Sequence, residues 1–402
     1  MKLKKYKLGD LVEVTRGASL SGQFYAEEGE LIRLTLGHFN MNGGGFKENT
    51  SKSDLYFTGP VKEEFILNKG DIITPLTEQS LGLLGTTARI PESGKYIQSQ
   101  DVALVRCKEG LLDPNFCYYL ISSSIVRQQL SAGAQQTKIR HTSPDKIKDC
   151  TVWVPEIDEQ KKIGRILSDI DDKIALNRQI NDNLEAMAKQ LYDYWFVQFD
   201  FPNEEGKPYK SSGGEMVWNE KLKREIPKGW DVKHIKEFMR IFTGKKDVSK
   251  AIPGKYKFFS CAPEPITSDE YIYDGYAILV SGNGSYTGRV GFYKGKFDLY
   301  QRTYACVLDQ NEFKIPFFYY TLRYLFQPIY GGGKHGSSIP YIVLGDLADF
   351  KFAYSEKLCC KFIEKVKPMF DEQLLNEKEI ETLTKQRDEL LPLLMNGQLT
   401  MK

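Results

Sequence analysis

The chain is organised around the stretch DEQKKIGRILSDIDDKIALNRQINDNLEAMAKQLYDYWFVQF, residues 158–199. Counted in sevens from Ile163, its inward positions alternate in spacings of three and four residues, which is typical of a long helix with one narrow apolar seam. Most charged residues fall outside the seam, where they can stay in water. The seam consists of Ile163, Leu167, Ile170, Ile174, Asn177, Asn181, Leu184, Ala188, Leu191 and Trp195. A seam this narrow needs a second helix as its partner.

A second stretch repeats the pattern at an offset of 199 residues, which places Asn376 in the slot of Asn177. Its seam consists of Phe362, Val366, Met369, Gln373, Asn376, Ile380, Leu383, Arg387, Leu390 and Leu394. The matched register predicts that the two helices pair, and it disfavours the alternative of two unrelated surface helices. Pro368 has no counterpart in the first copy, and we expect it to kink the second helix or to mark where its straight part begins.

The segments around these helices repeat as well. The stretch 317–326 echoes 116–124, and both carry a Tyr-Tyr pair. Within the first copy, Pro114 to Leu130 is predicted to form one helix. The expected organisation is a β-rich domain, a long helix, a linker rich in Gly, Pro, Lys and Glu, a second β-rich domain, and a second helix with a C-terminal tail. These parts are assigned to residues 1–154, 155–200, 201–229, 230–354 and 355–402.

Composition sets limits on the class of protein. The chain has 402 residues and is 41% hydrophobic, so it can bury more than one core. A net charge of +2 means that any nucleic-acid binding must use local basic patches. The 7 cysteines are an odd number without paired spacing, which indicates a reduced, cytoplasmic protein. No run approaches the roughly 18 apolar residues of a membrane span.

Catalytic motifs are absent from the sequence. There is no phosphate-binding loop, and the Gly-rich stretch 282–288 is one residue too long for a dinucleotide fingerprint. No Asn/Asp-Pro-Pro-aromatic stretch of the kind used by amino-methyltransferases occurs. The 4 histidines lack metal-ligand spacing with each other or with cysteine. We therefore expect no active site, cofactor or metal in this chain.

Two polar loops in each copy are the strongest candidates for a binding site. They combine Gln and Asn, which can bond adenine edges twice, with Arg and Lys, which suit guanine edges or phosphates. Solvated loops on any mixed domain look similar, but recurrence at the same place in both copies favours DNA contact. The candidate DNA-binding residues are Gln79, Ser80, Thr86, Gln135, Gln136, Lys138, Arg140, His141, Asn283, Ser285, Tyr286, Arg289, Lys334, His335 and Ser337.

Aromatic residues gather at two kinds of position. The pairs at 118–119 and 319–320 are expected in the core rather than as stacking platforms for bases. The aromatic cluster of 192–201, at the end of the first helix, fits two roles equally: hydrophobic core packing between helix and domain, or a docking site for a partner.

Several motifs together resemble one known family. They are the linker pieces SGGEMVWNE (212–220) and REIPKGW (224–230), the start of the first helix VPEIDEQKKI (154–163), its end YWFVQFD (194–200) and the tail LLPLLMNGQ (390–398). Over its full length the chain resembles the specificity (S) subunits of type I restriction–modification enzymes, the HsdS family. The start of the second helix, SEKLCC (355–360), departs from the Pro-x-x-x-Glu-Gln pattern of the family.

The resemblance implies an α+β fold in which two target recognition domains, in tandem repeat, are separated by two long antiparallel coiled-coil helices. Each domain would read one half of a split site in double-stranded DNA. Two methyltransferase (M) subunits, which use S-adenosylmethionine, would methylate adenine, and two restriction/translocase (R) subunits, which use ATP and Mg, would cleave. The chain itself would be non-catalytic. The alternatives are a coiled-coil scaffold that does not bind DNA and, disfavoured by the missing motif, a self-sufficient adenine methyltransferase.

Overall fold

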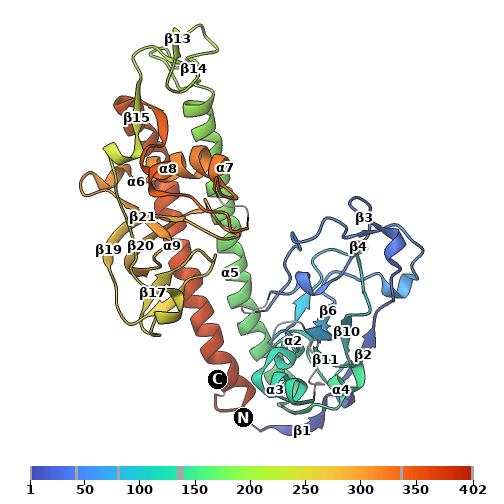
Figure 1. The fold of residues 1–402 in the computed structure, drawn as a ribbon. Helices are drawn as coiled ribbons and strands as arrows, with labels where there is room; N and C mark the ends of the chain where they lie inside the picture. The colour runs from blue at the N-terminus through green and yellow to red at the C-terminus, as the bar shows by residue number, and fades with distance from the viewer. Residues whose placement is uncertain (1, 41–43, 79–81, 134–139, 336–337, 400–402) are drawn as a thin grey trace. The chain divides into compact units, whose positions relative to one another are not determined.

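The computed structural model describes residues 2–40, 44–78, 82–133, 140–335 and 338–399 (Figure 1). The chain forms two compact units: unit 1 comprises residues 1–178 and 377–402, and unit 2 comprises residues 179–376. The division passes through both long helices. Each unit therefore contains one of the two repeated domains together with a part of each helix.

The domain of unit 1 is built from short strands and helices. One antiparallel sheet has the order β2-β10-β6-β8, with bounds Val12–Arg16, Val102–Cys107, Ile72–Pro75 and Ala88–Arg89. A second sheet has the order β3-β5-β4-β9, with bounds Tyr25–Ala26, Tyr56–Phe57, Ile32–Arg33 and Tyr96–Ile97. Two further ladders pair β1 (Lys4–Lys7) with β12 (Thr151–Val154) and β7 (Thr77–Glu78) with β11 (Arg140–His141). The helices are α1 (Leu8–Leu11), α2 (Pro114–Ser122), α3 (Ser124–Gly133) and α4 (Pro144–Lys148), with single turns at η1 (Gly22–Phe24), η2 (Leu36–His38) and η3 (Glu63–Phe65).

The single helix predicted from Pro114 to Leu130 is in fact two helices, α2 and α3. The predicted start is confirmed, because Pro114 occupies the first turn and the Asp113 side chain caps it by accepting from the Phe116 N–H. The break comes at Ser123, whose backbone is extended. Its hydroxyl donates to the carbonyl of Leu120 at 2.6 Å, a local bond that competes with helix continuation. Apolar spacing alone did not reveal this break.

The core of unit 1 joins the domain to both long helices. Leu8, Ile121 and Val152 of the domain share one buried cluster with Ile163 of the first helix and Leu394 of the second. All five side chains are essentially excluded from water. A second cluster lies between the two small sheets. The helix ends in this unit are therefore held by hydrophobic burial against the domain.

The domain of unit 2 is built on one six-stranded sheet. Its order is β16-β21-β19-β20-β17-β18, with bounds Arg240–Thr243, Thr303–Val307, Tyr273–Ser281, Val290–Leu299, Tyr256–Phe259 and Ile266–Ser268. All pairings are antiparallel except the parallel one between β17 and β20. Another ladder pairs β15 (Asp231–His234) with β22 (Lys351–Tyr354). The helical elements are η5 (Ile235–Glu237), η6 (Val248–Lys250), η7 (Glu312–Lys314), α6 (Ile315–Thr321), η8 (Leu322–Phe326), α7 (Gln327–Tyr330) and α8 (Leu344–Ala348).

The aromatic cluster at the end of the first helix is part of the core of unit 2. Tyr192, Trp195 and Phe196 are at most 5% exposed, and the Phe196 ring packs edge-on against Phe317 and Phe362. Of the two roles that the sequence left open, the structure therefore shows hydrophobic core packing between helix and domain. The pairs at 118–119 and 319–320 also lie in the cores of their units, as predicted.

The stretch between the first helix and the second domain is folded. Strands β13 (Met216–Asn219) and β14 (Arg224–Pro227) form an antiparallel hairpin. The Phe201 ring stacks on the rings of Tyr209 and Trp230, with centroids 4.7 and 5.4 Å apart. The Gly- and Lys-rich composition of this stretch predicted a linker and did not indicate the hairpin.

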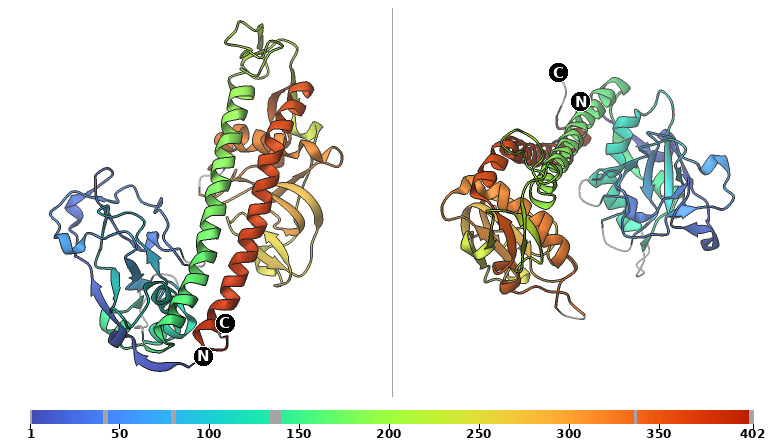
Figure 2. Two further views of the ribbon diagram at one scale, coloured as in Figure 1. Left: turned by 180° about the vertical axis from the view of Figure 1, so that it is seen from behind. Right: turned by 90° about the horizontal axis from the view of Figure 1, so that it is seen from above.

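The two long helices are α5 (Ile157–Tyr192), continued by the π-turn η4 (Asp193–Val197), and α9 (Glu356–Met395). They lie side by side (Figure 2). Helix α9 continues through Pro368, which lies on its exposed face, where water can satisfy a backbone carbonyl that loses its partner. The predicted pairing residues are all buried or half-buried: Ile163, Leu167, Ile170, Ile174, Asn177, Leu184, Leu191, Phe362, Val366, Asn376, Ile380, Leu383, Leu390 and Leu394.

Polar contacts connect the two helices within unit 1. Arg387 of α9 donates to Asp171 of α5 at 2.8 Å. The amide of Asn177 donates to Glu379 at 2.6 Å, and Lys173 lies 3.5 Å from the same carboxylate. Residue numbers rise along α5 as they fall along α9, so the helices are antiparallel.

The same direction holds within unit 2. The amide of Asn376 donates to the side-chain oxygen of Asn181 at 2.9 Å. Gln373 donates to the carbonyl of Asn181 at 3.1 Å and lies 3.4 Å from the carboxylate of Glu185. The fold is thus the expected one of two β-rich domains in tandem with a pair of long antiparallel helices.

Candidate nucleic-acid interface

The two polar loops predicted for each copy lie next to each other in both units. In unit 1, β7 pairs with β11, and the Thr142 N–H donates to the carbonyl of Leu76 at 2.8 Å. In unit 2, Asn283 forms an isolated bridge with Tyr341, and the Ile342 N–H donates to the carbonyl of Gly282 at 3.0 Å. The loop that follows the central strand therefore contacts the loop that follows the helix. The sequence predicted each loop, and the tertiary structure joins them.

A buried carboxylate organises the first loop of unit 1. Glu78 is 2% exposed and accepts the backbone N–H groups of Gly82, Leu83 and Leu84 at 2.9–3.1 Å. Its other oxygen lies 3.0 Å from the guanidinium of Arg140, in the second loop. A buried carboxylate needs such donors, because burial without them is unfavourable. Glu78 thus links residues 82–84, at the end of the first loop, to Arg140, at the end of the second.

Arg140, a predicted DNA contact, has several partners within the protein. Besides the pair with Glu78, its guanidinium donates to the backbone carbonyl of Ser131 and to the Ser131 hydroxyl. These bonds occupy the donors that base reading would need, so in this conformation Arg140 supports the loops. Its neighbour in sequence, His141, is exposed and remains available for contact.

Thr86 does not fit the predicted role. It is 2% exposed, and its hydroxyl donates to the carbonyl of Leu83 at 2.8 Å. It lies in the mostly buried segment between Leu83 and Ile90, where its side chain stabilises the local turn. Six other candidates lie outside the described residues: Gln79, Ser80, Gln135, Gln136, Lys138 and Ser337.

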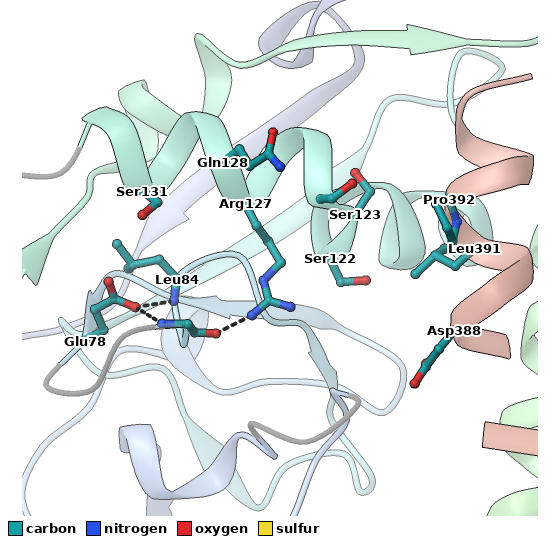
Figure 3. Close-up of a pocket in the computed structure, with 12 residues that line it drawn as sticks. Glu78, Leu84, Ser122, Ser123, Arg127, Gln128, Ser131, Asp388, Leu391 and Pro392 are labelled. Carbon is teal, nitrogen blue, oxygen red and sulfur yellow. Dashed lines mark hydrogen bonds between the residues drawn. The ribbon is translucent and has the colours of Figure 1, made fainter. Parts of the chain in front are cut away.

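A pocket of about 560 Å³ opens beside the loops of unit 1 (Figure 3). Arg127 of α3 extends into it and donates to the carbonyl of Gly82 at 2.5 Å. Asp388 and Leu391 of α9 line the side opposite. Sequence reasoning missed Arg127, and the only signal was a cation on the helix that precedes the second polar loop.

The exposed edge of unit 2 presents three of the predicted residues. Ser285 and Lys334 are exposed, and Tyr286 is 47% exposed. Asn283 is half-buried, and its side-chain oxygen accepts from the thiol of Cys261 at 3.1 Å. A hydroxyl, an ammonium and a phenol on one edge can bond to phosphates or base edges.

Arg289 and His335 are anchored within unit 2. Arg289 donates to the carbonyl of Ala262 at 2.6 Å, and burial lowers the pKa of its guanidinium below the usual value. His335 lies 3.1 Å from Asp346, which also accepts the Val343 N–H at 2.9 Å. Sequence reasoning missed the segment 260–263, which no polar pattern marked but which holds Arg289 and Asn283 in place.

Close packing between the loops of unit 2 requires glycine at one position. Gly288 has a φ of +80°, and a Cβ there would come within 2.5 Å of the Tyr330 carbonyl oxygen. The Gly332 N–H donates to the carbonyl of Thr287 at 3.1 Å, next to this close approach. Any larger residue at 288 would move one loop away from the other.

Two observations on the described residues bear on other classes of site. They contain no group of three or more His, Cys, Asp or Glu side chains arranged to hold a metal ion. Within the same described ranges, neither α5 nor α9, nor any shorter helix, is long and apolar enough to cross a membrane.

These features define a class: two β-rich domains in tandem, each packed on part of an antiparallel pair of long helices. The sequence matches the type I restriction modification DNA specificity domain over residues 2–186 and 227–354. The chain therefore belongs to this family, and its function is that of a type I restriction–modification specificity subunit. The family match supports a DNA specificity subunit over a coiled-coil scaffold that does not bind DNA. Specificity subunits are non-catalytic.

Individual relatives agree with the family. The chain is 26% identical over 323 residues to the type I restriction enzyme MjaIX specificity subunit of Methanocaldococcus jannaschii, covering 73% of this chain and 71% of the relative. It is 32% identical over 182 residues to the EcoDI specificity subunit of Escherichia coli, covering 44% and 40%. Its fold is similar to the crystal structure of the S subunit from M. genitalium, with a TM-score of 0.61, 20% identity, and 100% and 97% coverage.

Proposed function

We propose that the chain reads a bipartite target in double-stranded DNA, with one half-site bound by each domain. The observation that carries this proposal is the recurrence of the same loop-to-loop contact in both units, through Thr142 and Leu76 in unit 1 and through Ile342 and Gly282 in unit 2. Because the side chains on the two edges differ, the two half-sites should differ in sequence.

Partner subunits supply the chemistry in this proposal. Two methyltransferase subunits methylate adenine with S-adenosylmethionine, and two restriction/translocase subunits cleave with ATP and Mg. The chain itself binds no cofactor and chooses the DNA sequence. The family membership supports this division of labour, because a DNA specificity domain selects where its partners act.

The contact residues are proposed from exposure and position. His141 serves the half-site read by unit 1, and Ser285, Tyr286 and Lys334 serve the half-site read by unit 2. Arg140, Asn283, Arg289 and His335 position these loops through the bonds described above. Positioning residues affect recognition indirectly, so their substitution weakens a whole half-site rather than a single base position.

Sequencing of methylated bases in host DNA, with and without this gene, tests the proposal. The expected result is one motif with two specified halves separated by unspecified bases. Tyr286→Ala should relax one half only, and His141→Ala should relax the other, so each variant is the control for the other. A motif that is continuous, or one that both variants change in the same half, would contradict the proposal.

A further inference from the structure

The polar contacts between α5 and α9 mostly join unlike residues, so neither helix carries all the partners that a second copy of itself would need. On α5 they use Asp171, Lys173, Asn177, Asn181 and Glu185, and on α9 they use Gln373, Asn376, Glu379 and Arg387. Except for Asn177 and Asn376, which share a slot, each polar residue has a different residue at the equivalent position of the other helix.

The offset of 199 residues shows what stands at those equivalent positions. The counterparts of Gln373, Glu379 and Arg387 are apolar residues of α5: Ile174, Ile180 and Ala188. The counterparts of Asp171, Asn181 and Glu185 on α9 are Phe370, Ile380 and Thr384. The two seams therefore share their spacing and differ in chemistry.

A pair of identical helices would break these contacts. In the observed antiparallel register, a second α5 would place Ala188 opposite Asp171, where Arg387 now stands. A second α9 would place Phe370 opposite Arg387. Because such a pair has twofold symmetry, each mismatch would occur twice.

Burial makes the charged mismatch costly. The Arg387 side chain is 10% exposed and the Asp171 side chain is 27% exposed. Arg387 would keep only its bonds to the neighbouring Asp388, on its own helix. Removing one partner of a buried ion pair is strongly unfavourable, whereas replacing both partners by apolar residues is often neutral. The Asp171–Arg387 pair thus adds little net stability to the fold, but it strongly favours an unlike helix partner over a like one.

We propose that Asp171 and Arg387, with the other polar pairs beside them, make the helix pair selective for one α5 and one α9. An assembly then contains one copy of each recognition domain. The expected preference for the mixed pair is on the order of a hundredfold or more. The consequence, that one assembly reads two different half-sites, rests on the proposed function; the pairing selectivity itself does not.

Cutting the folded full-length chain removes the tether that otherwise favours the mixed pair. A protease site inserted between Glu205 and Gly206, in an exposed turn, yields two fragments that each carry one long helix. The fragments are separated in mild denaturant, diluted together and weighed by native mass spectrometry. The expected product is the one-to-one complex of unlike fragments, with self-paired complexes near one per cent or below.

The matched variant is Asp171→Leu with Arg387→Leu, cut in the same way. It should form self-paired complexes in measurable amounts, while the uncut double variant loses only the hydrogen bond from Tyr119 to residue 171 and so resists unfolding better than either single leucine variant. The charge-reversed variant, Asp171→Arg with Arg387→Asp, should keep the mixed complex. Scrambled fragments from the unmodified sequence would overturn the proposal, and so would a leucine variant that stays fully mixed.

Uncut chains provide a second measurement if the cut fragments fail to reassemble. Asp171→Arg alone and Arg387→Asp alone each lack the ion pair, but refolding them together allows two chains to exchange helices and restore it. Light scattering should then show a dimer only in the mixture. Dimers in either single-variant sample would contradict the selectivity. These assays contain no DNA, so failure of the proposed DNA recognition would leave their outcome unchanged.

Discussion

The two units fasten their long helices to their domains at equivalent positions but with opposite chemistry. In unit 1, the hydroxyl of Tyr119 donates to Asp171 at 2.6 Å, and the same carboxylate pairs with Arg387. Burial, together with the Asp171 charge, raises the pKa of Tyr119 far above its usual value, so this hydroxyl stays protonated and can donate. The contact of Tyr119, Asp171 and Arg387 forms the joint between domain and helices in unit 1. This joint is directional, because hydrogen bonds set its geometry.

In unit 2 the equivalent joint is made of aromatic rings. Phe370 occupies the position of Asp171 and packs against Tyr319 and Tyr320, with ring centroids 5.8 and 6.3 Å apart. Ala188 occupies the position of Arg387 and is fully buried. One backbone arrangement therefore accepts either a polar or an apolar joint. The difference teaches that the repeated fold requires buried side chains at these positions, whether polar or apolar. The chemical identity of those side chains then determines which helices can pair.

The largest effect is expected from breaking the polar joint. Arg387→Ala should lower the free energy of unfolding by about 3–4 kcal/mol, because Asp171 then keeps its charge without a cationic partner. Denaturant titration followed by circular dichroism measures the loss. Arg165→Ala is the control, since its side chain is 83% exposed and its ion pair should contribute less than about 1 kcal/mol. Equal losses from the two substitutions would show that the joint is not buried in solution.

Acid should weaken unit 1 through His38. Burial lowers the pKa of His38 to about 4, and its Nδ1 accepts the Thr35 N–H at 3.0 Å, which requires a neutral ring. Since the folded-state pKa lies below the unfolded value near 6.5, the stabilising contribution is present above pH 6.5 and disappears as pH falls to about 4. The loss should reach about 3 kcal/mol.

The measurement is unfolding of the intact chain as a function of pH, with His38→Gln as the variant. The substitution should flatten the pH dependence between about 6.5 and 4. His234→Gln is the control from unit 2, because His234 is only half-buried. A variant with the same acid slope as the unmodified chain would assign the acid lability to other groups.

The first turns of the two long helices offer a third, smaller contrast. Gln160 is 2% exposed, accepts the Asp113 N–H at 2.9 Å and donates to the carbonyl of Pro155 at 2.9 Å. Gln160→Ala should cost about 2 kcal/mol, because these buried backbone groups lose their partner. The equivalent residue of unit 2 is Cys359, and Glu356 instead pairs with Lys314 at 2.5 Å.

Glu356→Gln should cost about 1 kcal/mol, because solvent screens the carboxylate, whose side chain is 59% exposed, and the amide oxygen of Gln can still accept from the buried Lys314. Thermal unfolding of both variants compares the two first turns directly. A greater loss from Glu356→Gln than from Gln160→Ala would reverse the ranking and show that the ionic contact of α9 is the stronger one.

The smallest effect is expected at the exposed edge of unit 2. Lys334→Ala should weaken DNA binding by the assembled complex several-fold for every sequence and reduce the salt slope by about one, as for a phosphate contact. Ser285→Ala is the companion variant, in which a change of preferred base without a change in salt slope is expected. Filter binding or fluorescence anisotropy at several salt concentrations distinguishes the two behaviours.

The sequence by itself determined the repeat, the two seams and the polar loops. Regular spacing identifies helices because burial of one face follows the helical period, and Ile163, Leu167, Phe362 and Leu394 are buried as that period requires. The family was also evident from local motifs. The helix break at Ser123 was not, because it depends on a competing side-chain bond.

Only the tertiary structure decided what the polar residues do. Glu78 and Arg140 are 62 positions apart, and their pairing within one loop arrangement follows from the contact between β7 and β11. Likewise Arg387 occupied an apolar slot that the sequence could not explain until Asp171 and Tyr119 were placed beside it. Apolar burial obeys a local period, whereas a buried polar group is satisfied by whichever partner the fold brings within bonding distance.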